Sequence, residues 1–238
     1  ANPPTGKKGT HRAIEPSERM LIHSVQHRFR PVVMIMLYGG LRRGEALAID
    51  VDRDIDFVNK TITVREAVRF ELGHPLICDP KTEAGKRTIP LLDVLADELK
   101  GLHGLLAPAV HIRQNKNGSL GSGVMSESAF DSAWEGYLNA LETKLNGCCK
   151  RWYGKTNQHK AMLAKGEKLP PWKTVSIRPH DLRHTYCTML YNAGVDIKTA
   201  MKWMGHADQS MTLRIYSHLT DEREKSSAVA LAQSVNAM

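Results

Sequence analysis

The residues PHDLRHTYCTMLYNAGVDIKTAMKWMGHADQSMTLRIY, positions 179–216, decide the fold of this chain. Pro179 suits a first helical turn, and we expect that helix to run through Asn192. Asp196 then caps a short helix, which Gly205 ends, since glycine readily adopts the left-handed conformation found after helices. Another short helix is expected to follow. The stretch therefore predicts consecutive short helices with polar side chains at their ends.

The upstream sequence predicts a buried helix and a small sheet. Residues 32–38 are too apolar for a surface helix and are expected in the core. Apolar and polar residues then alternate over 55–58 and 61–64, on either side of a turn, and a third strand is expected at 87–89. We therefore expect an α+β fold that is mainly helical, with a small antiparallel three-stranded sheet. Further helices are expected at 43–49, 91–101 and 127–141.

The composition indicates a soluble protein with an anionic partner. The chain has 238 residues and a net charge of +8, with a pI near 9.4, a balance that favours nucleic acid. It has no apolar run of about 18 residues and no signal peptide, so we expect no membrane partner. Without a Cys-x-x-Cys spacing, free thiols in a reducing cytoplasm are expected. The cysteines are Cys78, Cys148, Cys149 and Cys187.

A basic segment precedes the deciding stretch. Residues 144–173 carry eight basic side chains and a single acid, Glu167, with aromatic residues between them. This pattern is expected either of a solvated surface insertion or of a segment that follows DNA, because cations neutralise phosphates and aromatic rings can stack on bases. Both interpretations stay open. The basic residues are Lys144, Lys150, Arg151, Lys155, Lys160, Lys165, Lys168 and Lys173.

Two arginines are suited to holding a phosphate. Arg42 follows the glycines that end the buried helix, where its guanidinium can emerge from the core. Arginine donates two parallel hydrogen bonds to a phosphate and keeps its charge. Alone, Arg42 would be read as a surface residue paired with Glu45. Arg183 lies three residues after His180, on one helix face, and His180 can exchange a proton near neutral pH.

Two histidines allow a second interpretation, a zinc site, and a further histidine and a tyrosine are candidates for the chemistry of a phosphate. His180 and His184 are spaced as zinc ligands on a helix could be, but no third ligand is obvious. His206 follows a glycine at a helix end, and Tyr216 comes ten residues later. A phenol has a pKa near 10, so it attacks poorly unless positive charge or a base favours the phenolate. Without that setting, Tyr216 would be a half-buried helical aromatic.

Three motifs together resemble the catalytic domain of tyrosine recombinases, the family of phage and conjugative-transposon integrases. They are Gly-Leu-Arg-x-Gly-Glu at 40–45, His-Asp-Leu-Arg-His-Thr at 180–185 and Met-Gly-His-Ala-x5-Leu-Arg-Ile-Tyr at 204–216. Both the residues of these motifs and their order along the chain match the family. The resemblance spans about 12–220, and it implies the fold of that catalytic domain. The residues it makes catalytic are Arg42, Lys81, His180, Arg183, His206 and Tyr216.

The resemblance implies DNA strand exchange without metal, ATP or another cofactor. Tyr216 would attack the scissile phosphate and form a 3′-phosphotyrosyl link, which releases a 5′-hydroxyl. Arg42, Arg183 and His206 would stabilise the transition state, where negative charge accumulates. A hydroxyl from a second duplex would then attack the phosphotyrosine.

The resemblance also implies two proton carriers. His180 would take or relay the tyrosine proton, and a lysine in a strand hairpin would protonate the leaving oxygen. The form Lys-Thr…Arg-x-Ile-Pro aligns Lys81 with that lysine, and Lys86 is the alternative. Hairpin lysines are commonly only solvated, so neither would be proposed without the resemblance.

We expect the following organisation. Residues 1–11 are a linker or a cloning remnant, 12–220 form the catalytic domain with a basic insertion at 144–175, and 221–238 form a C-terminal tail helix. Complete integrases commonly carry further DNA-binding domains before this one, so we expect the chain to be part of a longer protein.

The expected partners are double-stranded DNA attachment sites. The family implies a homo-tetramer on DNA, with a monomer as the alternative without DNA, and accessory DNA-bending or excision proteins as further partners. The expected location is the cytoplasm of a bacterium, on DNA, with a bacterial or phage gene. The alternatives are a type IB topoisomerase, a chromosome-resolving recombinase, and a non-catalytic regulator that uses helices 194–216 as a helix-turn-helix.

Overall fold

The computed structural model describes residues 12–80, 82–109, 123–206, 210, 212–213, 215–217 and 219–220. The predicted linker at 1–11 and the predicted tail helix at 221–238 lie outside these ranges. The described part begins with α1 (Pro16–Ser24), whose first turn contains Pro16 as predicted. Glu18 lies in the same turn and complements the positive end of the helix dipole.

The core is built around α2 (Arg30–Tyr38). Its residues from Val32 to Leu37 are all buried, which confirms the prediction from their apolar character. The helix ends at Gly39, whose N–H donates to the carbonyl of Ile35. The neighbouring helices α3 (Arg43–Ala48), α5 (Asp93–Leu99) and α8 (Pro179–Asn192) all pack against α2. The short helix α4 (Val51–Asp54) leads into the first strand.

The predicted three-stranded sheet is present. It consists of β1 (Ile55–Asp56), β2 (Thr61–Val64) and β5 (Arg87–Pro90), antiparallel and in the order β1-β2-β5. Ile62 of β2 lies opposite Ile89 of β5, and both are buried. The short 3₁₀ helix η1 (Glu83–Gly85) directly precedes β5.

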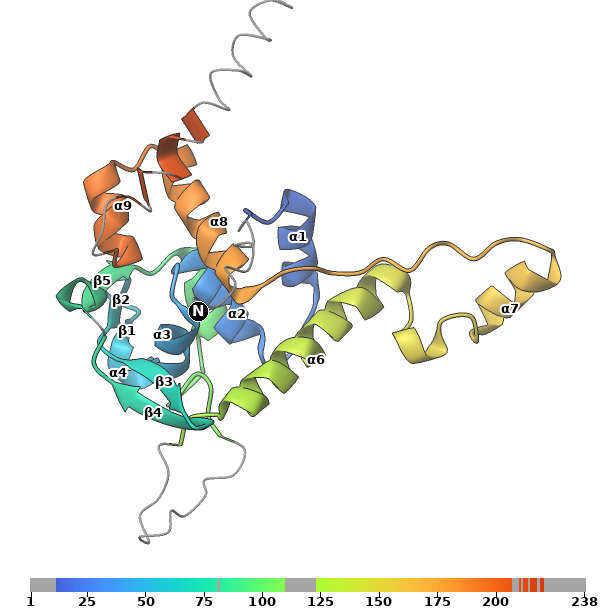
Figure 1. The fold of residues 1–238 in the computed structure, drawn as a ribbon, viewed down its shortest axis with the longest axis horizontal. Helices are drawn as coiled ribbons and strands as arrows, with labels where there is room; N and C mark the ends of the chain where they lie inside the picture. Colours follow the sequence, from blue (N-terminus) through green and yellow to red (C-terminus); the bar gives the residue numbers. More distant parts are fainter. Residues whose placement is uncertain are drawn as a thin grey trace, which may run out of the picture.

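A second sheet was not predicted. The strands β3 (Ala67–Glu71) and β4 (His74–Cys78) form a hairpin that extends beyond α3 and α4 (Figure 1). Val68 and Phe70 of β3 alternate with exposed, charged residues, but this run is short, and the sequence HPLIC of β4 has no alternation of apolar and polar residues.

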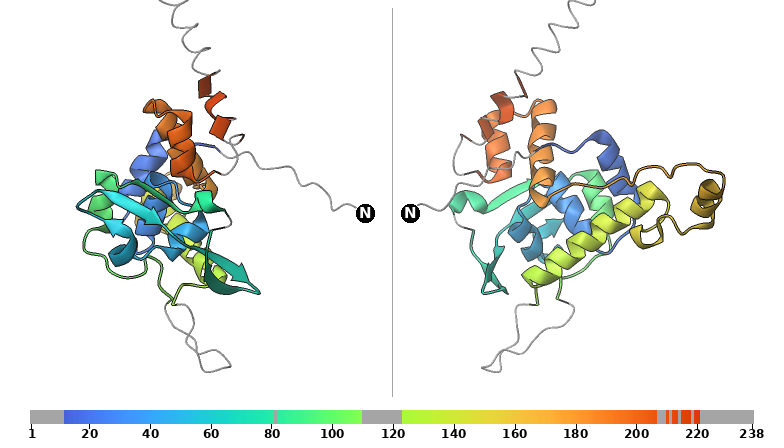
Figure 2. Two further views of the ribbon diagram at one scale, coloured as in Figure 1. Left: turned by 90° about the vertical axis from the view of Figure 1, so that its left-hand side faces the viewer. Right: turned by 45° about the vertical axis from the view of Figure 1, so that its right-hand side comes forward.

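The helix α6 (Glu127–Asn146) runs five residues beyond the predicted end at 141. It turns Phe130, Ala133, Tyr137 and Leu141 towards the core, a spacing that keeps one face buried. Ser126 caps its start, and Gly147 ends it in the left-handed conformation. Beyond it, η2 (Lys150–Trp152) and α7 (Asn157–Ala164) project away from the main body (Figures 1 and 2).

The deciding stretch folds as predicted. The helix α8 has the expected bounds, and α9 (Ile197–Met204) begins where the Asp196 side chain accepts a hydrogen bond from the N–H of Thr199. Gly205 ends α9 with φ of 62°. The backbone at 212–213 and 215–217 is helical, in agreement with the expected last helix. A small hydrophobic cluster forms on α8 and α9, separate from the main core.

Two further expectations can be compared with the structure. All four cysteines are free thiols, as predicted. Within the described ranges, no helix combines the length and the apolar character needed to cross a membrane.

Candidate active site

Glu45 holds together the arginines of the candidate site. It lies in the first turn of α3, is 3% exposed, and accepts a hydrogen bond from the backbone N–H of Arg42 at 2.9 Å. Its Oε1 accepts from Nη1 of Arg42 at 2.8 Å, and its Oε2 accepts from Nη2 of Arg87 at 2.8 Å. Nη1 of Arg183 lies 3.9 Å from Oε2. One carboxylate thus contacts side chains from three distant segments of the chain.

The charge of Glu45 is stabilised by these arginines. Burial opposes ionisation, but the hydrogen bond from Arg87 and the positive charges of Arg87 and Arg183 outweigh it and lower the pKa of Glu45 to about 2. Glu45 is therefore ionised throughout the neutral range. With three arginines around one carboxylate, the cluster keeps an excess of positive charge.

Arg183 is buried on α8 and reaches two backbone carbonyls. Its Nη1 donates to the carbonyl oxygen of Gly40, and its Nη2 donates to that of Met204 at the end of α9. Burial, reinforced by the positive charge of Arg42, lowers the pKa of Arg183 to about 9 despite the charge of Glu45. Arg183 therefore stays protonated at neutral pH.

Glycine is required where α2, α8 and Arg42 meet. Gly40 has φ of 64°, and a Cβ there would lie 2.2 Å from the ring of Tyr186. The chain turns sharply at this point, so Arg42 emerges at the start of α3 with its side chain 40% exposed. Nη2 of Arg42 also donates to the carbonyl of Gly205 at 3.1 Å. Arg42 therefore bridges the start of α3 and the end of α9.

Arg87 is a member of the cluster that the sequence did not reveal. It lies on β5 with its side chain 2% exposed, and donates from Nε to the carbonyl of Trp203 at 2.7 Å and from Nη1 to that of Gly85 at 3.0 Å. Its links to Glu45, α9 and η1 join the sheet to the helices. A lone arginine in a short strand is commonly a surface residue. The spacing Arg-x-Ile-Pro, which puts Arg87 on the buried face with Ile89, was the available signal.

His206 lies beside the arginines, directly after α9. Its Nδ1 is 2.7 Å from the hydroxyl of Thr212, which is fully buried. Burial, followed by the positive charges of Arg183 and Arg42, lowers the pKa of His206 to about 4. The ring is therefore neutral at pH 7. A neutral ring can donate one hydrogen bond to a phosphate oxygen.

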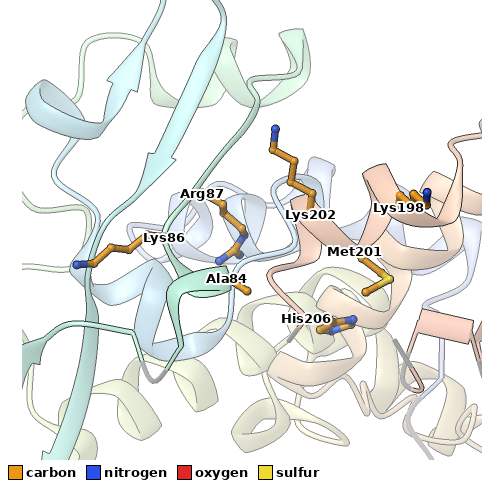
Figure 3. A pocket seen from close by; sticks show the side chains of 7 residues that line it. All are labelled: Ala84, Lys86, Arg87, Lys198, Met201, Lys202 and His206. Atoms are coloured by element: carbon orange, nitrogen blue, oxygen red, sulfur yellow. The ribbon is translucent and has the colours of Figure 1, made fainter. Parts of the chain in front are cut away.

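A cationic hollow adjoins the cluster. It has a volume of about 380 Å³ and lies between η1, the start of β5 and α9 (Figure 3). Its basic side chains, together with His206, are suited to an anion. The residues that line it are Ala84, Lys86, Arg87, Lys198, Met201, Lys202 and His206.

Of the two candidate lysines, the structure describes only Lys86. Lys81 lies outside the described residues. The ammonium of Lys86 is 3.0 Å from Oδ1 of Asp79, and this hydrogen bond raises the pKa of Lys86. In Figure 3 the end of its side chain points away from His206. Lys86 is thus held by Asp79 at the edge of the cationic hollow.

His180 is exposed in the first turn of α8, whereas Arg183, on the next turn, is buried. The predicted common helix of the two residues is present, but their exposures differ. Among the described residues, no group of three or more His, Cys, Asp and Glu side chains is placed to hold a metal ion.

Tyr216 lies apart from the arginines. Its hydroxyl donates to the carbonyl of Val195 at 3.2 Å, and its ring packs edge-on against Tyr191 with centroids 5.1 Å apart. Burial raises the pKa of Tyr216 to about 12, with smaller contributions from Cys187, which ionises only at high pH, and from the negative charge of Asp196. We expected the arginines and histidines to favour the phenolate. In the described structure, the surroundings of the hydroxyl favour the phenol.

The helix α9 separates Tyr216 from the cluster. Val195, which binds the phenol, precedes α9, and Gly205, which binds Arg42, follows it. A helix of eight residues is about 12 Å long. The structure therefore brings Arg42, Arg183 and His206 together, with Arg87 as an addition, and places Tyr216 at the opposite end of α9.

The chain is similar to known recombinases. The sequence profile of the phage integrase family matches residues 148–223. The transposase from transposon Tn916 of Enterococcus faecalis is 29% identical over 190 residues, which cover 79% of this chain and 42% of that protein. The integrase of Staphylococcus phage L54a is 25% identical over 210 residues, 85% of this chain and 52% of that protein. The chain thus spans about half the length of these relatives.

The fold is shared with a solved integrase. The Tn1549 transposon integrase, in complex with transposon right end DNA, has a TM-score of 0.58 and 24% identity, covering 96% of this chain and 68% of that one. The predicted fold, a tyrosine recombinase catalytic domain with a small antiparallel sheet, is confirmed, as is the resemblance to the integrase family.

Proposed function

We propose that this chain is the catalytic part of a tyrosine-type site-specific DNA recombinase that integrates or excises a mobile element. The observation that carries the proposal is the arginine cluster around Glu45, with neutral His206 beside it. The similarity to the Tn916 transposase and to a phage integrase supports the same activity.

The charge of the cluster suits the transition state of phosphoryl transfer. Three arginines and one carboxylate leave two net positive charges. A phosphodiester carries one negative charge, and its pentacovalent transition state carries two. Charges that are fixed before the reaction stabilise this increase without rearranging. Arg42, the exposed member, would bind a non-bridging oxygen first, with Arg183 and His206 acting on the others.

Tyr216 is proposed as the nucleophile, and it must move before it can react. Its hydroxyl would leave the carbonyl of Val195 and reach the phosphate at the other end of α9. There the arginines and the bound phosphate would replace surroundings that now raise the pKa of the phenol. The attack forms the bond from the Tyr216 oxygen to phosphorus and breaks the bond to the 5′-oxygen.

The remaining roles are proposed in the same scheme. His180 would take or relay the phenol proton, and Lys81, or Lys86 in its place, would protonate the leaving 5′-oxygen. A 5′-hydroxyl of a second duplex would attack the phosphotyrosine and release Tyr216. The energy of the broken bond is kept in the ester, so the scheme uses no cofactor.

We further propose the setting of the reaction. Residues 12–220 would act as the catalytic domain, with 221–238 as a tail helix, in a homo-tetramer on two DNA attachment sites. Accessory DNA-bending or excision proteins would join this complex, in the cytoplasm of a bacterium. The positive net charge of the chain supports the DNA partner.

The experiment uses nicked duplexes that trap the covalent intermediate because the short cleaved strand diffuses away. A library randomised around the nick removes the need to know the attachment site. We expect a protein–DNA adduct with the wild-type chain and none with Tyr216→Phe, which should still bind DNA. Tyr191→Phe is the matched control, since it removes the hydroxyl from the neighbouring ring, and it should form the adduct. An adduct at normal yield with Tyr216→Phe would refute the role of Tyr216.

A further inference from the structure

The basic insertion, residues 144–175, forms an arm outside the body of the protein. After α6 the chain makes η2 and α7 and returns as an extended segment to α8 (Figures 1 and 2). From 144 to 174 it contributes no side chain to either hydrophobic cluster among the described residues, and Val175 is the first residue to rejoin the main core. This basic arm is therefore not needed to complete the core.

The arm nevertheless has its own internal structure. The ring of Tyr153 packs edge-on against Trp172, with centroids 5.2 Å apart, and against His159 at 5.0 Å. The Tyr153 hydroxyl donates to the carbonyl of Pro170, which ties the start of the arm to its end. The Thr156 hydroxyl accepts from the N–H of His159 and caps α7. The arm is thus held in one shape by its aromatic residues.

Contacts at the base attach the arm to α6. The buried carboxylate of Glu142 accepts from Nε1 of Trp172 at 3.1 Å and from the N–H of Val175 at 3.0 Å. Asn146 exchanges two hydrogen bonds with the backbone of Lys173, both at 2.9 Å. These bonds fix the direction in which the arm leaves the body.

The charge of the arm is unbalanced and accessible. The segment 144–173 carries seven of the eight net positive charges of the chain. All eight of its basic side chains are exposed. None of them forms an ion pair with another described residue, although Arg12, Arg30 and Arg53 elsewhere do. Unpaired cations on a structured arm indicate an anionic partner outside the chain.

We propose that the basic arm binds the sugar–phosphate backbone of double-stranded DNA beside the cleavage site. This rests on the proposed function for the position of the DNA. A duplex fits better than a single strand, because two of the three large aromatic rings of the arm, Tyr153 and Trp172, pack against each other, and of the three only Trp152, 56% exposed, offers a ring for base stacking. The contacts are with phosphates, so they depend on charge and not on sequence.

The position of the arm at the end of α6 determines which part of the duplex it can contact. The first turn of α6 is joined to the residue after Arg42 by the ion pair of Arg43 with Glu127, at 3.1 Å. The helix α6 has 20 residues and is therefore about 30 Å long, and the arm begins at its far end. For a duplex that runs along α6, at about 3.4 Å per base pair, the arm would contact the backbone about nine base pairs from the arginine cluster.

The test measures how DNA affinity depends on salt. The full chain and the variant Lys160→Gln/Lys165→Gln are titrated with a 40-base-pair duplex of mixed sequence. The logarithm of the binding constant falls with that of the salt concentration by about 0.9 for each phosphate contact. We expect the slope to become shallower by about 2 and the affinity to fall by about tenfold or more at 0.1 M salt.

The matched control is Arg28→Gln/Lys100→Gln, which removes the same charge from exposed positions outside the arm. It should change the slope by less than half as much. Equal changes in the two variants, or no change in the arm variant, would overturn the proposal. A loss on a 40-nucleotide single strand but not on the duplex would also overturn it, because it would indicate base stacking.

The result that would refute the proposed function differs from the result that would refute DNA binding by the arm. Tyr216→Phe should keep the wild-type salt slope, because it removes no charge. If no nicked duplex traps the wild-type chain, the proposed function fails, and the difference in slope between arm and control variants still decides the role of the arm.

Discussion

The side chains of the arginine cluster and the side chain of Tyr216 differ in the number and strength of the contacts that hold them in place. Glu45 is buried and accepts hydrogen bonds from Arg42 and Arg87, and the side chain of Arg87 is 2% exposed. Tyr216 is held by a single hydrogen bond of 3.2 Å from its hydroxyl and by ring packing on a small cluster. The residues proposed to stabilise charge are thus fixed by buried ion pairs, whereas the proposed nucleophile is held by one hydrogen bond and by ring packing.

Because its contacts are separate from those of the arginine cluster, the proposed nucleophile Tyr216 can move without changing the contacts of the arginines. Relocating Tyr216 breaks one neutral hydrogen bond, whose net contribution to stability is about 1 kcal/mol, and takes its buried ring out of the small cluster, which costs about 2 kcal/mol more unless the ring is buried again. Relocating Arg87 or Arg183 would leave buried charges without partners, at a cost of several kcal/mol. In the proposed function, DNA binding would rearrange the tyrosine and leave the arginines in place.

The largest expected effect is on the cluster. Glu45→Gln removes the carboxylate that compensates Arg87 and Arg183, so we expect the free energy of unfolding to fall by about 3 kcal/mol or more. Urea denaturation measures this loss. The control Glu127→Gln breaks an exposed ion pair with Arg43 and should cost less than about 1 kcal/mol. Equal losses of unfolding free energy in the two variants would show that the buried ion pairs of Glu45 contribute no more to stability than the exposed pair of Glu127.

A smaller effect is expected from His206 and pH. Its folded pKa of about 4 lies below the ordinary value of 6.5, so between these values the unfolded chain binds a proton that the native ring does not. The stability of the wild type should therefore fall as the pH drops from 6.5 to 4, by less than about 1.4 kcal/mol per pH unit from this residue.

Urea denaturation across this range, compared with His206→Gln, isolates the contribution of the ring. We expect the variant to lose stability less steeply between pH 6.5 and 4. The same pH dependence in both proteins would mean that neither burial nor the arginines lower the pKa of His206.

The smallest effect on stability is expected from a substitution of Tyr216. Tyr216→Phe removes the hydrogen bond to Val195 and keeps the ring, so the free energy of unfolding should fall by about 1 kcal/mol or less. A loss as large as that of Glu45→Gln would contradict the view that this tyrosine is loosely held.

The sequence predicted those elements whose signals are local. Pro179, Asp196 and Gly205 define α8 and α9 because capping depends on the residues next to the helix end. The motifs likewise identified Arg42, Arg183 and His206, which the structure brings together. These predictions required no knowledge of the tertiary packing.

The features that the sequence did not reveal depend on distant contacts. In the hairpin of β3 and β4, the alternation is confined to a few residues of β3, and β4, which has no buried residue, shows none. Arg87 became part of the site through Glu45, 42 residues away. The end of α9 at which the Tyr216 hydroxyl lies depends on packing against α8, since the spacing from His206 to Tyr216 allows either end.

The residue that becomes linked to DNA can be identified directly. Wild-type chain trapped on a nicked duplex is digested with trypsin, and the peptide linked to DNA is identified by mass spectrometry. We predict the peptide of residues 215–223, whose one tyrosine is Tyr216, with a phosphate on that side chain. A DNA-linked peptide from any other part of the chain would contradict the claim.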